Sequence, residues 1–447
     1  NLSMLSENVK KTLEEIKKEE LPEQTGVDVH AETQTPLGIS DVVTAVRHLG
    51  SQTENLIKII LAVYASTFIE KKDPIWLMIV GNPSSNKTTL VDLLSGLEDV
   101  YRIDTMTANP FSSGQRESDK PKDLLPLLYG KCLIIKEYGA IFGRGDEVVK
   151  QLIGELVAIY DGEYSKHSPT RGTIKYESYF SHIGCVTPMA LNARQRYMNA
   201  VGARFLFFRV PVLTEIEKDS NLKDVWLNSA KLSKGEVGNC VKVFCNVLKD
   251  KVKLGATPTF PENVQNILNK MALLIARARG IVITEQNTFN TPNGHEMKHY
   301  EVVDKQVEEP FRALMQLKKL AGSLALVNGN DIVGEEELQL LRLVVLSSMH
   351  VRRADVLNVF KKGHSFTAKK ASDLLNKNYK TVKRNLDELV ALEILQDEKG
   401  GNDLARAYCL KEEFLPILCP DRSPVVQNAL KVFGQDTVLD SDDKEDV

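Results

Sequence analysis

The sequence lacks any apolar run that approaches the roughly 18 uninterrupted residues needed to cross a membrane. It also lacks the opening of a signal peptide, because its first thirty residues are rich in Lys and Glu. Cysteine is sparse, with six residues and no CxxC pair, which favours buried free thiols over disulfides or a zinc site. There is no excess of positive charge, since the formal net charge is −3, so any DNA binding must use local patches. These absences predict a cytoplasmic protein without a membrane span.

What the sequence has is the composition of a folded protein, with 447 residues of which 43% are hydrophobic and 26% charged. This length accommodates two or three domains. Residues 1–37 are charged and then rich in Pro, Thr, Gln and Glu, so we expect a helix followed by a linker. The chain begins with Asn1 rather than Met, which suggests a processed or truncated chain and leaves open whether an N-terminal domain precedes it. Residues 421–447 are predicted to form a disordered acidic tail.

Short apolar runs alternate with polar segments between Pro74 and Pro211. They are "IWLMIVG", "CLIIKEYG", "YFSHIGCVTP" and "RFLFFRVPV". Runs of this length separated by helical stretches predict buried parallel strands, so we predict an α/β core at 38–212. Helical periodicity beyond Pro211 predicts a helical region at 213–350.

A further compact unit is predicted at 351–420. A short helix over Thr367–Leu375 is followed by a turn and by a second helix, which would bury Val382, Leu386 and Leu389. Apolar residues resume at Ile394, and a hairpin is expected at Gly400. This sequence of elements is that of a winged helix-turn-helix.

A candidate phosphate loop follows the first apolar run. It comprises Gly81, Asn82, Pro83, Ser84, Ser85, Asn86, Lys87, Thr88 and Thr89. Such a loop needs small residues whose backbone N–H groups face phosphate oxygens, a lysine for the β- and γ-phosphates of ATP, and a hydroxyl for Mg²⁺. Lys87 and Thr88 meet these needs. Asn86 replaces the usual second glycine, which is feasible because Asn tolerates positive φ.

The second apolar run ends in "KEYG", where Glu137 is placed to orient and deprotonate an attacking water. Lys136 stands where nucleotide hydrolases have a first carboxylate. It could pair with Glu137 or contact phosphate, and we predict a working ATPase with altered magnesium dependence. The alternative is an ordinary core strand that ends in a solvated Lys-Glu pair. Two later runs place Thr187 at the end of a strand, where it could hydrogen-bond the attacking water or the γ-phosphate, and Arg204 at the start of one.

The order of these elements resembles that of the AAA+ superfamily, and within it the minichromosome maintenance helicases and their relatives on bacterial mobile elements and phages. The shared features are "GNPSSNKT", a threonine before proline in "CVTP", an "RF" pair in "GARF", and "YDGEYSK". The resemblance covers roughly residues 38–350 and implies a P-loop ATPase core at 38–212 followed by an α-helical lid at 213–350. It does not extend to the zinc-bearing N-terminal collar of the maintenance helicases.

The resemblance implies a role for each matching residue. Lys87 would bind phosphate, Thr88 and Glu137 would hold Mg²⁺ partly through water, and Thr187 would be the first sensor. Arg204 would be an arginine finger that reaches a neighbouring subunit, which implies a homo-hexamer. Arg312 fits the second sensor, with a solvated helix-face arginine as the alternative.

DNA contacts are predicted in two places. A hairpin is expected around Ser168 and Gly172, and the resemblance implies that it projects into a central pore that holds single-stranded DNA. Its candidate contacts are Lys166, Arg171 and Lys175. In the winged helix-turn-helix, duplex contact is predicted for Lys380, Lys383 and Arg384. The alternatives are a surface hairpin with incidental charges and a winged helix that docks protein.

The stretch "HEMKH", His295–His299, matches the pattern of zinc proteases, whose chemistry needs a helix and a third ligand. The stretch follows a cluster of turn formers and precedes an extended-looking segment. A surface hairpin is therefore the preferred interpretation.

Taken together, the sequence predicts an ATP-driven hexameric DNA helicase or translocase that serves the replication of a mobile element or phage. One alternative is a AAA+ switch that loads or remodels proteins on DNA without unwinding it. Another is a nucleotide-dependent scaffold that does not hydrolyse ATP.

Overall fold

The computed structural model describes residues 37–47, 49–50, 53–70, 72–107, 110–112, 123–169, 171–193, 204–227, 233–290, 296–363, 365–398 and 406–420. The expected N-terminal helix, Gly400 and the acidic tail lie outside these residues. The chain forms two compact units, the first from residues 1–268 and 309–348 and the second from 269–308 and 349–447. The region predicted at 213–350 therefore contributes to both units. The predicted domain boundaries stay predictions.

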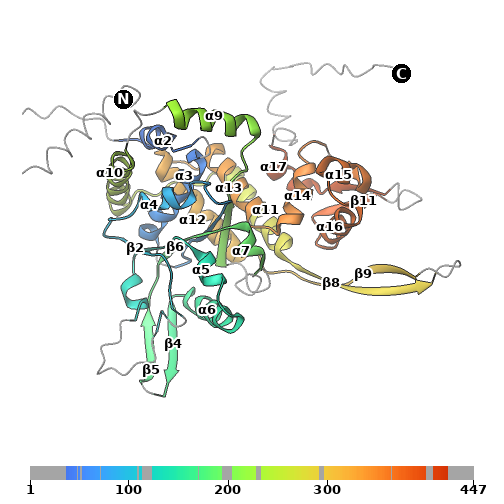
Figure 1. Cartoon of the computed structure of the whole chain (residues 1–447), viewed down its shortest axis with the longest axis horizontal. Coiled ribbons are helices and arrows are strands. Elements are labelled where there is room, and N and C mark those ends of the chain that lie inside the picture. Colours follow the sequence, from blue (N-terminus) through green and yellow to red (C-terminus); the bar gives the residue numbers. More distant parts are fainter. Residues whose placement is uncertain are drawn as a thin grey trace, which may run out of the picture. The chain divides into compact units, whose positions relative to one another are not determined.

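The first unit contains a five-stranded parallel sheet in the order β2-β3-β6-β1-β7. Its strands are β2 (Val100–Ile103), β3 (Cys132–Ile135), β6 (Ser181–Val186), β1 (Trp76–Val80) and β7 (Phe205–Arg209). Each predicted apolar run forms one of these strands, so the prediction of buried parallel strands is confirmed. This α/β arrangement is consistent with a P-loop core (Figure 1).

Both faces of the sheet are covered, because all residues of β1, β3 and β6 are buried. On one face, Trp76, Met78 and Val80 join an apolar cluster with α5 (Tyr138–Phe142) and α6 (Asp146–Ile159). Helix α3 (Thr53–Ile69) packs against β3 and β6, and α12 (Phe311–Asn328) packs against α3. A helix buried on most of its circumference, as α3 is, belongs in a layered core.

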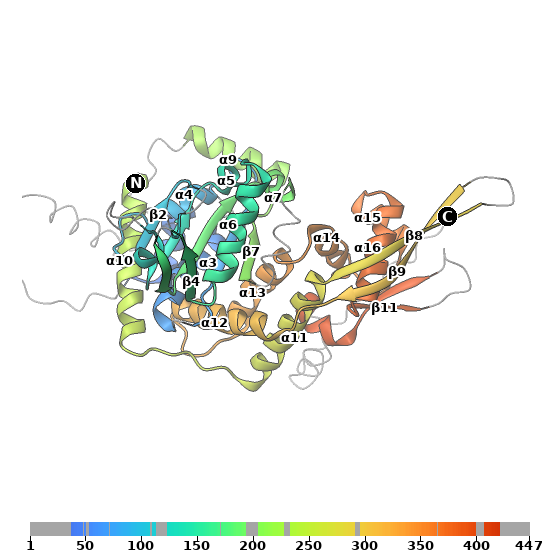
Figure 2. The ribbon, with the colours of Figure 1, turned by 90° about the horizontal axis from the view of Figure 1, so that it is seen from below.

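The remaining elements of the first unit surround this core. Short elements connect the strands, namely α4 (Lys87–Asp92), η3 (Leu125–Leu128) and α7 (Pro188–Ala193). Longer helices follow or precede the sheet, namely α2 (Ile39–Arg47), α9 (Glu215–Leu227), α10 (Lys234–Lys253) and α13 (Glu335–Ser347). Helix α10 lies beside α2 and α3 (Figures 1 and 2). Its first turn is fixed by a capping box between Ser233 and Glu236.

A two-stranded antiparallel hairpin is inserted between α6 and β6. It comprises β4 (Glu163–Ser168) and β5 (Gly172–Glu177), and it extends away from the sheet (Figure 1). Gly172 has φ of 69°, a left-handed conformation that suits glycine at the turn. The hairpin predicted from the turn formers in this stretch is therefore confirmed.

The second unit combines a long hairpin with a small helical domain. The hairpin comprises β8 (Ile281–Asn290) and β9 (Glu296–Gln306), which agrees with the hairpin preferred for "HEMKH" (Figure 2). The helices are α14 (Val351–Val359), α15 (Ala368–Leu375), α16 (Tyr379–Ala391) and α17 (Leu415–Leu418), with η5 (Glu412–Phe414) before α17. The strands β10 (Ser365–Thr367), β12 (Ala407–Leu410) and β11 (Leu395–Glu398) form an antiparallel sheet in that order. Helix α11 (Glu262–Arg279) crosses the boundary between the units.

One buried arginine connects the parts of the second unit. Arg353 of α14 donates to Glu388 of α16 (2.9 Å) and to the carbonyls of Ala278 (2.9 Å) and Gly280 (2.6 Å). A buried guanidinium is tolerated when its donors are satisfied in this way. Val382, Leu386 and Leu389 of α16 are buried as predicted.

No helix in the described part of the chain is both long and apolar enough to cross a membrane.

Candidate nucleotide-binding site

The candidate phosphate loop leaves β1 at Gly81 and enters α4 at Lys87. Asn86 has φ of 60°, in the left-handed region that Asn tolerates better than most residues. This explains why the sequence can carry Asn where the pattern has a second glycine. The Asn86 side-chain amide also donates to the Leu49 carbonyl, and Gly50 lies against the same amide. Neither Leu49 nor Gly50 carries a sequence signal for this contact.

Two observations indicate that the loop is suited to bind an anionic group. A Cβ atom at Gly81 would lie 2.5 Å from the Ser85 hydroxyl oxygen, and that buried oxygen has no hydrogen-bond partner among the described residues. Lys87 is only 6% exposed, and its ammonium donates to the Asn82 carbonyl (3.0 Å) with no carboxylate partner in the described part of the chain. A buried ammonium and an unsatisfied hydroxyl in one loop are costly unless an anion such as phosphate completes the site.

Thr187 lies beside the start of this loop. The Gly81 amide donates to the Val186 carbonyl (3.1 Å), so the loop begins next to the residue that follows β6. The Thr187 hydroxyl accepts from the Ala190 amide (3.4 Å) at the start of α7. The oxygen retains a second lone pair and a proton for another partner.

Glu137 lies at the same edge, because the carboxyl ends of parallel strands meet there and Ile135 of β3 pairs with Gly184 of β6. Glu137 is the N-cap of α5, and its Oε1 accepts from the Gly139 amide (2.9 Å). The side chain is exposed. The sheet therefore brings the predicted loop, base and first sensor to one edge.

Several charged side chains surround the buried thiol of Cys185 at this edge of the sheet. Burial raises the pKa of Cys185 to about 12. Smaller effects come from the surrounding charges of Lys87, Glu137, Asp92 and Lys136. The site therefore contains two cations and two carboxylates around the carboxyl end of β6.

Lys136 pairs with Asp92 rather than with Glu137. Its ammonium lies 3.1 Å from Asp92 Oδ2 and 3.6 Å from Asp104. Burial acts to raise the pKa of Asp92, but the hydrogen bond from Lys136 and the nearby cations, including Arg102, outweigh it and lower the pKa. The expectation that Lys136 could pair with Glu137 is therefore wrong, because the last residue of α4 supplies a closer carboxylate.

Arg204 and Arg312 lie together at the opposite edge of the sheet. Both guanidinium groups contact the Tyr160 ring, at 5.8 and 5.6 Å from its centroid, and both lie 3.7 Å from Asp161. The Tyr160 hydroxyl donates to Pro74, just before β1 begins. Burial and the neighbouring Arg312 lower the pKa of Arg204. Neither arginine lies at the candidate phosphate loop of the same chain.

Two of the three hairpin cations are engaged within the unit. Lys166 pairs with Glu155 (2.8 Å), and Arg171 pairs with Asp123 (2.7 Å). Lys175 on β5 is exposed. DNA contact by Lys166 or Arg171 would have to replace these ion pairs and stays a prediction.

The three cations of α16 occupy different environments. Lys380 is exposed, and Lys383 is half-buried. Arg384 pairs with Glu388 (3.3 Å) and lies over the ring of Tyr300 from β9, 5.5 Å from its centroid. The hairpin β8–β9 therefore covers part of the face that was predicted to contact DNA.

The "HEMKH" stretch does not lie in a helix where it is described. Glu296–His299 belong to β9, and His295 lies outside the described residues. Within the described part of the chain, no group of three or more His, Cys, Asp or Glu side chains could hold a metal ion.

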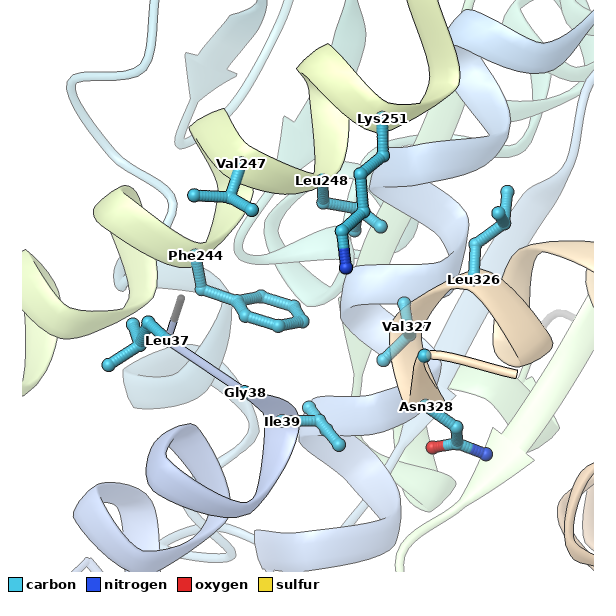
Figure 3. A pocket seen from close by; sticks show the side chains of 11 residues that line it. Leu37, Gly38, Ile39, Phe244, Val247, Leu248, Lys251, Leu326, Val327 and Asn328 are labelled. Carbon is cyan, nitrogen blue, oxygen red and sulfur yellow. The ribbon is translucent and has the colours of Figure 1, made fainter. Parts of the chain in front are cut away.

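A small cavity of about 60 Å³ lies between α2, α10 and α12 (Figure 3). Its lining is mainly apolar, including Leu37, Phe244 and Val327, with the Lys251 side chain at one side. None of the predicted site residues lines it.

Neither a family model nor a curated protein matches the chain. Two solved structures align with most of it. One is described as a "putative ATPase" from Cytophaga hutchinsonii, with 14% identity, a TM-score of 0.37, and coverage of 77% of this chain and 89% of that chain. The other is the ORC2 protein of Aeropyrum pernix in its ADP form, with 12% identity, a TM-score of 0.27, and coverage of 87% and 98%.

Substitution of Lys136 tests the ion pair. Lys136→Met is expected to lower the free energy of unfolding by about 1 kcal/mol at neutral pH, as for a partly exposed pair. Because the folded-state pKa of Asp92 is lowered, this stabilisation is present above the ordinary aspartate pKa and lost as pH falls through the folded value. Urea unfolding of the unmodified chain and of Lys136→Met, at neutral pH and below about pH 3, measures this difference in the free energy of unfolding.

The double-mutant cycle is the control for this prediction. Asp92→Asn should cost a similar amount, and the combined variant should cost little more than either single one. Additive losses, or a loss from Lys136→Met that does not change with pH, would show that the pair contributes nothing.

Proposed function

We propose that this chain is a AAA+ ATPase that binds and hydrolyses ATP at the carboxyl edge of the parallel sheet. The observation that carries the proposal is a loop in which Lys87 is buried without a carboxylate partner in the described part of the chain and the Ser85 hydroxyl is unsatisfied. Glu137 and Thr187 lie at the same edge, where a base and a polar sensor are needed.

In this proposal, the loop holds ATP and magnesium, while Glu137 and Thr187 act on the attacking water. Lys87 and the backbone amides of Ser84–Thr89 hold the β- and γ-phosphates, and Thr88 offers its hydroxyl to Mg²⁺. Bound magnesium would neutralise charge that develops on the phosphates. Glu137 orients the attacking water and accepts its proton through the oxygen that Gly139 does not hold. Thr187 contacts that water or the γ-phosphate.

Lys136 changes the magnesium chemistry without removing the base. Asp92 is neutralised by Lys136, so it is a poor ligand for waters around the metal. Thr88 and Glu137 then provide the protein side of the magnesium site. We therefore expect an altered magnesium dependence and retained turnover.

We further propose that Arg204 and Arg312 act on a neighbouring copy in a head-to-tail ring, for which six subunits are expected. Support comes from their place at the edge opposite the phosphate loop. A head-to-tail contact joins two different surfaces of the same chain. Apolar side chains are exposed on both edges, with Met189 (83%) two residues after Thr187 and Phe311 (70%) next to Arg312.

The proposed work of the ring is translocation on single-stranded DNA, as a helicase in replication of a mobile element or phage. The hairpin β4–β5 would contact phosphates through Lys175, and through Lys166 and Arg171 if DNA replaces their ion pairs. The second unit has the element order of a winged helix-turn-helix, with Lys380 at the start of its second helix. A AAA+ loader and a non-hydrolysing scaffold are the alternatives.

Two substitutions test the ATPase proposal. Lys87→Ala should reduce ATP binding and turnover together, because phosphate loses its cation. Glu137→Gln should retain binding and reduce turnover by about a hundredfold or more, because only the base is lost. Steady-state turnover and calorimetric ATP binding measure both. The exposed α6 residues Lys150→Ala and Glu147→Gln are matched controls, and full turnover in Glu137→Gln would end the assignment of the base.

Mixing variants tests the action of Arg204 on a neighbour. Arg204→Ala and Glu137→Gln rings should each be inactive. At equal mixing, about a quarter of the interfaces join an intact base to an intact arginine, so turnover should return to about that fraction. If the mixture stays inactive while both variants still assemble, the arginine does not act across the interface.

An unwinding assay separates the helicase from its alternatives. A forked DNA duplex should be separated only when ATP and magnesium are present. DNA-stimulated ATP turnover without strand separation would favour the loader, and nucleotide binding without turnover would favour the scaffold.

A further inference from the structure

Tyr138 follows Glu137 directly and makes a buried polar contact that the proposed mechanism does not use. The side chain is 2% exposed, and its hydroxyl oxygen lies 2.6 Å from Nε2 of the fully buried His182. His182 Nδ1 lies 2.9 Å from the Leu133 carbonyl oxygen. Three elements, α5, β6 and β3, are therefore joined through one imidazole.

The direction of each hydrogen bond follows from the chemistry of its atoms. A carbonyl oxygen only accepts, so His182 Nδ1 must carry the proton that it donates to Leu133. Burial lowers the pKa of His182 to about 4, so the ring is neutral near pH 7 and Nε2 has a free lone pair. The Tyr138 hydroxyl therefore donates to Nε2. Removing that hydroxyl would leave a buried acceptor unsatisfied.

The Tyr138 ring is fixed as firmly as its hydroxyl. A Cβ atom at Gly184 of β6 would lie 2.5 Å from the Tyr138 ring, so this glycine is what lets the ring lie against the strand. Phe142, one turn along α5, packs against the ring with centroids 5.4 Å apart. The first residue of α5 is consequently held at both its ring and its hydroxyl.

Glu137 depends on this fixed residue because it is the N-cap one position earlier. Its Oε1 accepts from the Gly139 amide, and no described donor contacts Oε2. A Cβ atom at Gly139 would lie 2.5 Å from Oε1. The start of α5 thus decides where the carboxylate points.

We propose that Tyr138 is a positioning residue for Glu137, and that the Tyr138–His182 hydrogen bond holds the start of α5 so that Oε2 faces the attacking water. The inference rests on the proposed role of Glu137 as the base. It assigns a function to the "YG" that follows Glu137 in "KEYG": the tyrosine anchors the helix start, and the glycine leaves room for the carboxylate.

The test is a double-mutant cycle on the full chain. Tyr138→Phe should lower kcat for ATP by about tenfold to a hundredfold, because a misplaced base loses near-attack geometry. ATP affinity should change by less than about twofold, because the phosphate loop is untouched. In the Glu137→Gln background, Tyr138→Phe should cause no further loss, because there is no base left to position.

Two further variants keep the test decisive if Tyr138→Phe is unstable. Gly139→Ala does not touch the Tyr138–His182 contact but displaces the Glu137 carboxylate, so it should give the same fall in kcat with unchanged ATP affinity. Tyr64→Phe removes another buried tyrosine hydroxyl in the same unit, one without a hydrogen-bond partner among the described residues, and should leave kcat unchanged.

The outcomes distinguish the two proposals. If Glu137→Gln abolishes turnover while Tyr138→Phe and Gly139→Ala keep wild-type kcat, the positioning role is wrong and the ATPase proposal stands. A further fall when Tyr138→Phe is added to Glu137→Gln would also overturn the positioning role, since it would indicate a purely structural effect. If Glu137→Gln itself keeps wild-type turnover, the proposed base is wrong.

Discussion

The hydrogen bond from the Gly81 amide to the Val186 carbonyl is the contact on which the rest of the site depends. It continues the β1–β6 ladder one residue past the end of β1, so the proposed phosphate loop starts beside Thr187. Because β3 pairs in parallel with the other side of β6, Glu137 reaches the same edge. The position of the site is thus a property of strand register, and the chemistry is added by the residues that follow each strand.

Lys136 pairs with Asp92 instead of the adjacent Glu137. A lysine at the end of β3 would be hard to accommodate beside a buried cation such as Lys87 without a carboxylate nearby. Asp92, the last residue of α4, supplies that carboxylate and lies within reach of Lys136. The pair ties the helix after the phosphate loop to the strand that delivers Glu137. Glu137, the proposed base, makes no pair with Lys136 and instead accepts from the Gly139 amide as the N-cap of α5.

Much of the fold could be predicted from the sequence because its signals are local. The apolar runs identified every strand of the sheet except β2, and the loop pattern with Asn86 agreed with the observed left-handed backbone. The partners of the charged residues could not be predicted, because topology brings them together. Lys136 meets Asp92 across 44 positions, and Arg171 meets Asp123 across 48. Tyr160 contacts both the finger candidate Arg204 and the second-sensor candidate Arg312, and this shared contact is another product of tertiary structure.

The central claim is that the site hydrolyses ATP although Lys136 replaces a carboxylate. The most direct measurement is steady-state ATP turnover by the unmodified chain in the presence of magnesium and single-stranded DNA, together with calorimetric ATP binding by the same sample. We expect ATP turnover that saturates with ATP concentration and requires magnesium. Tight ATP binding without any turnover over the full range of magnesium concentration would contradict it.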